Sequence, residues 1–183
     1  MIETARLELR LPTGDDLAWR LEAMNTPGVM RHLGGVRAPD DVSAGLSRDM
    51  EGFVTDGIGF WTIWLRGTDE RAGKCGLSMM TSELAPQELQ GRPQIGWSLA
   101  ERYWGQGIAV EAARAVLAYG FATLDHHEIW SQTSDSNAAS TRLMERLGFA
   151  RRADLAYADP AYPPEDNPTT VYYLDRAGWA AAA

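Results

Sequence analysis

The residues with the clearest chemical potential lie in the segment Arg102–Ala109, where Gly105 and Gly107 precede a stretch of helical periodicity. Glycine lets the backbone turn sharply and approach a ligand closely. The first amides of a helix have no partner within the helix, and the helix dipole adds partial positive charge there. The segment therefore predicts a cradle for an anion such as a diphosphate, with Arg102 as an added cation. A glycine turn that holds no ligand is the alternative.

Two other glycine-rich phosphate sites do not fit this segment. The dinucleotide fingerprint Gly-x-Gly-x-x-Gly would need a third glycine where Val110 stands, and the phosphate loop of nucleotide hydrolases would need Gly-Lys-Ser/Thr. A nucleotide-binding protein that uses the loop in another way stays a hypothesis. The chain carries 17 Lys+Arg against 25 Asp+Glu, a net charge of −8, which argues against a surface for nucleic acid. An anion must therefore be held by local contacts.

Composition excludes several further classes. One cysteine, Cys75, cannot form an intramolecular disulfide, and with three scattered histidines it supplies no zinc cluster, so no metal is expected. No apolar run approaches the roughly 20 residues of a membrane helix, and residues 1–6 lack the features of a signal peptide. We expect a cytoplasmic protein without a membrane partner. Its 183 residues predict a single domain over 1–183.

The elements that must position the glycine segment follow from periodicity. Alternation and apolar or aromatic runs predict strands, and spacing of three and four predicts helices. The expected strands are 6–11, 60–65 and 73–80 (a hairpin), 94–99, 128–133, 149–155 and 170–175. The expected helices are 13–24, 40–55, 109–124 and 137–147, with a break at 26–28, a stop at Gly148 and a frayed alanine tail.

The order strand, long helix, strand over 94–133 predicts a crossover that makes its two strands parallel. The other connections favour antiparallel pairing. We expect an α+β fold in three layers, with one mixed, mostly antiparallel sheet of about seven strands, flanking helices and one parallel, splayed pair. An exposed edge strand such as 6–11 would permit a homodimer without requiring one.

Four stretches together resemble a known family. Arg102-x-x-Gly105-x-Gly107-x-Ala109, followed by Glu111-Ala112, is similar to the acyl-CoA pyrophosphate loop of the GNAT superfamily of N-acyltransferases. The other stretches, 4–10, 95–99 and 137–149, resemble the branch that contains the RimJ and RimL ribosomal-protein N-terminal acetyltransferases. The resemblance spans roughly residues 3 to 179 in the right order. It makes a bound ligand the preferred reading of the glycine segment.

The resemblance implies acetyl-CoA as co-substrate, with its pantetheine arm in the gap between the diverging strands 94–99 and 128–133. An extended amide-bearing chain can satisfy strand groups that have lost their partners. The implied cofactor-binding residues are Ile95, Gly96, Trp97, Arg102, Trp104, Gly105, Gln106, Gly107, Ile108, Ala109, Asn137 and Ser140. Asn137 could instead be only a helix N-cap, and Gly96 only an ordinary strand glycine.

The resemblance also suggests roles in proton transfer. Ser140, one helical turn after Asn137, is implied as the proton donor to the leaving thiolate, although it could merely fill space against the sheet. Many relatives carry a glutamate where this chain has Gln94, whose amide cannot accept a proton. Glu83, in the polar stretch before that strand, is the candidate base. We do not expect Cys75 to act as a nucleophile.

The predicted reaction is transfer of an acetyl group to a primary amine in a ternary complex. A protein N-terminal α-amine is the favoured acceptor, and a small amine such as an amino acid, a polyamine or an aminoglycoside is the runner-up. Acidic residues in the loop 159–168 could form a lid that attracts a cationic amine, or simply be solvated. A non-catalytic CoA sensor is the alternative from another class.

Overall fold

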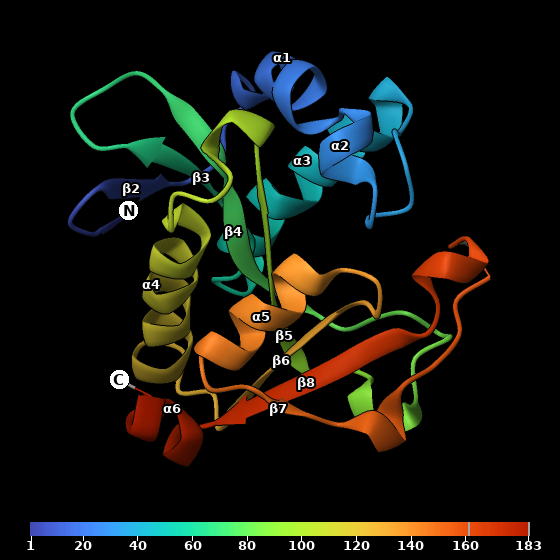
Figure 1. Cartoon of the computed structure of the whole chain (residues 1–183). Coiled ribbons are helices and arrows are strands. Elements are labelled where there is room, and N and C mark those ends of the chain that lie inside the picture. The colour runs from blue at the N-terminus through green and yellow to red at the C-terminus, as the bar shows by residue number, and fades with distance from the viewer. Residues whose placement is uncertain (161, 183) are drawn as a thin grey trace. The chain divides into compact units, whose positions relative to one another are not determined.

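The computed structural model describes residues 1–160 and 162–182. The chain forms a single mixed sheet of eight strands in the order β1-β2-β3-β4-β5-β6-β8-β7 (Figure 1). Strands β5 and β6 run parallel, whereas β1–β2, β2–β3, β3–β4, β6–β8 and β7–β8 are antiparallel. The strands are β1 (Ile2–Glu3), β2 (Leu7–Arg10), β3 (Phe60–Leu65), β4 (Arg71–Met79), β5 (Pro93–Leu99), β6 (Glu128–Ser134), β7 (Ala150–Arg151) and β8 (Thr169–Asp175).

The helices lie in the connections between these strands, except α6, which follows β8. They are α1 (Asp16–Trp19) with its π-helical continuation (Arg20–Met24), α2 (Pro27–Met30), α3 (Pro39–Thr55), α4 (Ile108–Ala122), α5 (Ala138–Arg146) and α6 (Arg176–Ala182). The contacts divide the chain into two compact units. Unit 1 comprises Met1–Ser78 and Gly96–Val116, and unit 2 comprises Met79–Ile95 and the residues from Leu117 onward.

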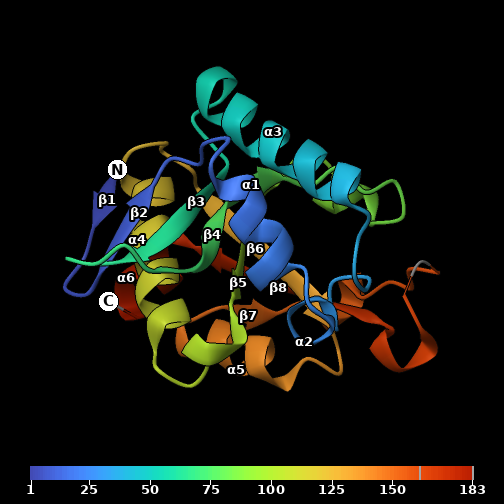
Figure 2. The ribbon, with the colours of Figure 1, turned by 90° about the horizontal axis from the view of Figure 1, so that it is seen from above.

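Unit 1 contains the hairpin and the helices on both of its faces. Strand β2 buries Leu7 and Leu9 beside Ile63 of β3, and α4 turns its small Ala112 and Ala113 inward. Helix α3 lies behind strands β3 and β4 in Figure 1, whereas the first turns of α4 lie in front, and Figure 2 shows the same separation from above. Unit 1 therefore has the three layers that the sequence predicts.

A buried carboxylate connects helix α1 to the hairpin of β3 and β4. Asp16, at the start of α1, accepts hydrogen bonds from Thr62 (2.9 Å) and Arg71 (2.8 Å). Asp16 and Thr62 are fully buried, so both depend on this pairing to compensate for the loss of water. The contact ties α1 to the middle of β3.

Unit 2 is built on β6 and β8, which pair over seven residues from Glu128↔Asp175 to Ser134↔Thr169. Helix α5 lies in front of these strands (Figure 1). It ends as predicted at Gly148, which has φ +89°. The amide of Gly148 donates to the carbonyl of Glu145, and that of Phe149 to Met144, each at 3.0 Å. This pair of bonds is the Schellman motif that satisfies the last carbonyls of a helix.

The predicted strand 149–155 was too long. Only Ala150–Arg151 pair with β8, and a 3₁₀ turn over Ala153–Leu155 follows. Leu155 is buried in a cluster with Met80, Leu89, Trp130 and Val171. The turn that places Leu155 in this cluster interrupts the pairing with β8, which resumes at the isolated bridge Tyr157↔Thr169.

The expected edge at 6–11 is also corrected. Strand β2 pairs with β3 on one side and with β1 on the other, so the edge is the two-residue β1. A turn over residues 4–6 folds the first residues back along β2. The resulting strand β1 brings the sheet to eight strands instead of the expected seven. The amide of Thr4 donates to the carbonyl of Leu7 at 2.9 Å across this turn.

Two segments expected to be irregular are helical. Thr26 was expected within a break, but its hydroxyl caps α2 by accepting from the amide of Val29 (3.2 Å), and Pro27 occupies the first helical position. The alanine tail was expected to fray, but residues 176–182 form α6, whose Gly178 amide donates to Asp175 (2.7 Å). Ala183 lies outside the described residues.

Candidate active site

The glycine segment folds as an anion loop, the name used below for residues 102–109. The two glycines adopt positive φ, +74° at Gly105 and +77° at Gly107, and α4 begins at Ile108. The Trp104 indole donates to the carbonyl of Leu99 at 2.9 Å, and the Gln106 amide donates to the carbonyl of Arg102 at 2.8 Å. Both side chains thus brace the loop from within.

The loop presents its glycines to solvent. Gly105 and Gly107 are exposed, and a Cβ on Gly105 would meet nothing within 4 Å. The first intrahelical bond runs from the amide of Glu111 to the carbonyl of Gly107 (3.1 Å), so the amides before Glu111 have no carbonyl one turn earlier to bond. Unit 1 therefore carries an open helix start of the kind that binds anions.

Arg102 lies on the side of the loop. Its guanidinium is 4.7 Å from the ring centroid of Tyr103, which is buried and donates its hydroxyl to Glu70 at 2.7 Å. Burial is the main reason that the pKa of Tyr103 is raised. The Arg102 side chain is itself exposed, and Tyr103 anchors the loop beneath it.

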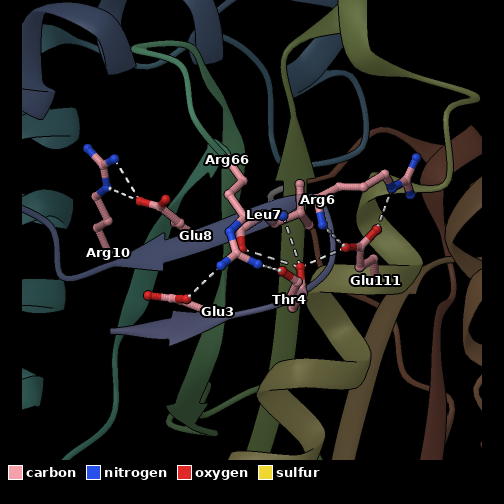
Figure 3. A network of polar contacts seen from close by, with 8 residues as sticks. All are labelled: Glu3, Thr4, Arg6, Leu7, Glu8, Arg10, Arg66 and Glu111. Carbon is pink, nitrogen blue, oxygen red and sulfur yellow. Dashed lines mark hydrogen bonds and ion pairs between the residues drawn. The ribbon is translucent and has the colours of Figure 1, made fainter.

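Sequence reasoning assigned no role to the side chains that hold the loop from outside. Glu111, in the first turn of α4, accepts from the hydroxyl of Thr4 (2.6 Å) and from the backbone amide (2.9 Å) and Nε (2.6 Å) of Arg6. Arg6 also donates from Nη1 to the carbonyl of Gln106 at 3.0 Å. Figure 3 shows Thr4 and Arg6 converging on Glu111 from the turn before β2. No sequence signal could reveal a contact across 105 residues.

These contacts set the charge state of Glu111. Burial would raise the pKa of its carboxyl, but the hydrogen bonds from Thr4 and Arg6 act in the opposite direction, and the pKa is lowered. The Arg6 side chain is 54% exposed and that of Glu111 is 18% exposed, so the ion pair faces solvent on the arginine side. Glu111 is therefore ionised and paired at neutral pH.

Gly96 of β5 faces an aromatic ring. A Cβ at this position would lie 3.0 to 3.1 Å from the ring atoms of Phe60, so the glycine lets Phe60 lie against the strand. The ammonium of Lys74 lies 4.9 Å from the centroid of the same ring. The Phe60 ring therefore lies near both Gly96 and Lys74, a lysine for which the sequence predicted no role.

Lys74 is the only lysine in the sequence. It is half-buried on β4, and burial is the main reason that its pKa is lowered to about 8. Asp49 opposes this shift, whereas Arg20 adds to it, and the two are themselves paired at 2.6 Å. A substantial fraction of this amine is therefore neutral near pH 8.

The parallel strands β5 and β6 pair beside Gln94 in unit 2. Within the described residues, the only backbone register between β5 and β6 is Gln94↔Trp130. One residue further on, the hydroxyl of Ser131 donates to the carbonyl of Ile95 at 3.1 Å. The Ile95 side chain is buried, so only its backbone could meet a ligand.

Asn137 is the N-cap of α5. Its Oδ1 accepts from the amide of Ser140 at 3.2 Å, and its Nδ2 donates to the hydroxyl of Thr133 at 3.0 Å. The helix cap that the sequence predicts is thus present, and Ser140 is half-buried in the first turn. Glu83 is exposed in the turn after β4, outside the helices and strands.

The acidic loop of unit 2 does not direct all its carboxylates outward. Asp166 is buried and accepts from the hydroxyls of Ser134 (3.1 Å) and Ser136 (2.5 Å). Its charge thus fastens the loop to the end of β6. Cys75 is fully buried, and burial raises the pKa of its thiol, so it is no nucleophile.

The described residues, 1–160 and 162–182, contain no group of three or more His, Cys, Asp or Glu side chains placed to hold a metal ion. No helix among them has the length and apolar character needed to cross a membrane.

Comparison with known proteins agrees with this geometry. The family model described as an acetyltransferase (GNAT) domain matches residues 6–150. An uncharacterized N-acetyltransferase p20 from Bacillus licheniformis is 29% identical over 157 residues, which are 83% of each chain. The FsC-acetyl coenzyme A-N(2)-transacetylase of Aspergillus fumigatus is 28% identical over 184 residues, 97% of this chain and 77% of that one.

A solved structure agrees as well. The acetyltransferase from Agrobacterium tumefaciens superposes with a TM-score of 0.77 and 27% identity, covering 96% of this chain and 94% of that one. The matched region of the family model contains the anion loop, both strands of the parallel pair and helix α5. The chain is thus an N-acetyltransferase that belongs to the GNAT acetyltransferase family.

Proposed function

We propose that the protein transfers the acetyl group of acetyl-CoA to a primary amine, with a protein N-terminal α-amine as the favoured acceptor. The observation that carries the proposal is the anion loop, where two glycines of positive φ open the start of α4. A diphosphate fits it because amides and a guanidinium can act at contact distance, whereas the net charge of −8 acts through screened solvent beyond about 8 Å.

The acceptor preference rests on the cost of deprotonation. At 1.36 kcal/mol per pKa unit, the neutral form at pH 7 costs an α-amine of pKa near 8 about 1 kcal/mol, and a lysine side chain about 4.6 kcal/mol. Gln94 cannot serve as the carboxylate base of many relatives. An acceptor that needs little help is therefore favoured.

In this proposal each part of the site has a task. The anion loop residues Arg102, Trp104, Gly105, Gln106, Gly107, Ile108 and Ala109 hold the diphosphate. Ile95, Gly96 and Trp97 contact the pantetheine arm and thioester through the β5 backbone, and Asn137 contacts the arm. Ser140 donates a proton to the leaving thiolate. Positioning and polarisation of the thioester carbonyl supply much of the acceleration.

Two side chains compete for the role of base. Glu83 is exposed and could act directly or through water. Lys74 is the second candidate, supported by its place on the ring of Phe60, which lies against Gly96. Its pKa of about 8 matches that of an α-amine, the condition under which proton exchange costs least.

Calorimetric titration with CoA, combined with a thiol-release assay over an amine panel, tests the proposal. We expect CoA to bind and peptides with a free α-amine to give the highest kcat/KM. The same peptides with blocked N-termini are the matched control and should be inert. Binding without turnover on any amine would indicate a CoA sensor, and tighter binding of ATP or NAD than of CoA would contradict the cofactor assignment.

A small-molecule amine is the second candidate acceptor. The name of the Aspergillus fumigatus relative specifies transfer to an N(2) position. Amino acids, polyamines and aminoglycosides therefore belong in the same panel. A kcat/KM for any of them that exceeds every peptide would replace the favoured acceptor and leave the acetyltransferase reaction intact.

Ser140→Ala is expected to lower kcat modestly, by less than about tenfold, because a thiolate of conjugate pKa near 8.5 leaves readily without an acid. The measurement is kcat against pH for the variant and the parent. Because Asn137 caps α5 through the backbone amide of residue 140, the fold should tolerate the change. An unchanged kcat at every pH would remove Ser140 from the mechanism.

A further inference from the structure

The turn before β2 contacts both the backbone of the anion loop and the first turn of α4. Arg6 donates to two different parts of the loop region, the carboxylate of Glu111 and the carbonyl of Gln106. Thr4 adds a third contact, its hydroxyl on Glu111. Figure 3 shows the bonds from Thr4 and Arg6 to Glu111 arising from one short turn.

The contact between Arg6 and Glu111 compensates a negative charge that is unfavourable for anion binding. Glu111 lies in the first turn of α4, next to the amides that would bind a diphosphate. A carboxylate there stabilises the helix dipole but repels an anionic ligand. The Arg6 guanidinium, with Nε 2.6 Å from the carboxylate, compensates this charge.

The contact between Arg6 and the carbonyl of Gln106 sets the direction of the following backbone amide, that of Gly107. The Gln106–Gly107 peptide is trans, so its carbonyl and its N–H point in opposite directions. Because Arg6 fixes the carbonyl at 3.0 Å, the amide of Gly107 is turned away from Arg6. A loop with two glycines would otherwise sample many conformations, and fixing it in advance removes an ordering cost from binding.

We propose that Arg6 is a positioning residue for the diphosphate of acetyl-CoA, an inference that rests on the proposed function. It acts through Glu111 and the carbonyl of Gln106, and Thr4 supports it. Arg6 is not a catalytic residue in this proposal, since it sets the affinity for the donor and not the chemistry of transfer.

The central experiment is calorimetric titration of CoA into Arg6→Gln. We expect Kd to rise by about tenfold or more, because a charge-assisted pair and an oriented donor are lost. Arg6→Lys keeps the charge without the fork and should fall between this variant and the parent. Adding Glu111→Gln to Arg6→Gln removes the uncompensated carboxylate, and should restore affinity by about threefold or more.

Two controls separate positioning from general damage. Arg10→Gln breaks a similar pair on β2, where Arg10 bonds the carboxylate of Glu8, and it should leave the Kd for CoA unchanged. S-acetylpantetheine lacks the diphosphate, so kcat/KM for this donor should be equal in Arg6→Gln and the parent. A fold defect would lower it.

The outcomes distinguish the two proposals. If the parent binds CoA and Arg6→Gln binds it equally well, or if Glu111→Gln brings no recovery, the role of Arg6 is overturned and the proposed function stands. If the parent does not bind CoA at all, the proposed function fails first. Equal losses with both donors would mean that Arg6 is merely structural.

Discussion

Replacement of Gly107 by valine is expected to raise the Kd for CoA by about a hundredfold or more. The glycine has φ +77°, which a β-branched residue adopts only under strain. A Cβ there would also lie 3.5 Å from Nη2 of Arg6, between the loop and the side chain that orients it. The substitution thus strains the loop backbone that presents the amides and places a side chain against Arg6. Calorimetric titration with CoA measures the effect.

Gly67 provides the matched control, because it has nearly the same φ, +74°, and open space around its Cβ position. It lies between β3 and β4, outside the anion loop. Gly67→Val should carry similar backbone strain while leaving the affinity for CoA within about twofold of the parent. Equal CoA affinity in Gly107→Val and the parent would refute the anion loop as the diphosphate site, and with it the proposed function.

Lys74→Met is expected to stabilise the protein at pH 7 while reducing its activity. In the folded state the pKa of Lys74 is lowered from 10.5 to about 8, which means that the folded protein disfavours the charged amine. Methionine has a similar length and no charge. We expect the free energy of unfolding to rise by about 1 to 3 kcal/mol, the upper figure lying close to the value for the full pKa difference without solvent screening.

The pH dependence of this gain has a fixed sign. Below pH 8 both folded and unfolded states hold the proton, so the penalty in the parent is complete. Between about pH 8 and 10.5 the unfolded state binds more protons than the folded state, so the stability of the parent rises with pH. The difference between parent and variant should therefore shrink over this window. Denaturant unfolding at pH 7, 9 and 10.5 measures it.

Lys74→Arg is the charged control, since a guanidinium cannot deprotonate, and it should be no more stable than the parent. Because Lys74 is the only lysine, ¹³C-methylation of amines gives one side-chain signal, whose midpoint should lie near pH 8.

Kinetic measurements separate the two candidate bases, Lys74 and Glu83. A loss of about a hundredfold in kcat/KM for Lys74→Met, with Glu83→Gln near the parent, assigns the base to Lys74, and the reverse pattern assigns it to Glu83.

Local signals in the sequence were sufficient for much of the fold. The hairpin of β3 and β4, the crossover from β5 through α4 to β6, and the stop at Gly148 follow from periodicity and turn chemistry, and the structure confirms them. The predictions failed where contacts between residues far apart in the sequence outweighed the local pattern. Leu155 left the predicted strand for a buried cluster, and β1 covered the edge assigned to β2.

The sequence alone was enough to predict a diphosphate site at residues 102–109, because glycine conformation and a helix start are properties of adjacent residues. Only the tertiary structure decided what orients that loop and which amine lies beside Phe60. Arg6 meets Glu111 across 105 residues, and Lys74 acquires its lowered pKa from burial and from Arg20, against the opposing effect of Asp49. Such charges and hydrogen bonds depend on distances in space, which the spacing of residues along the chain does not encode.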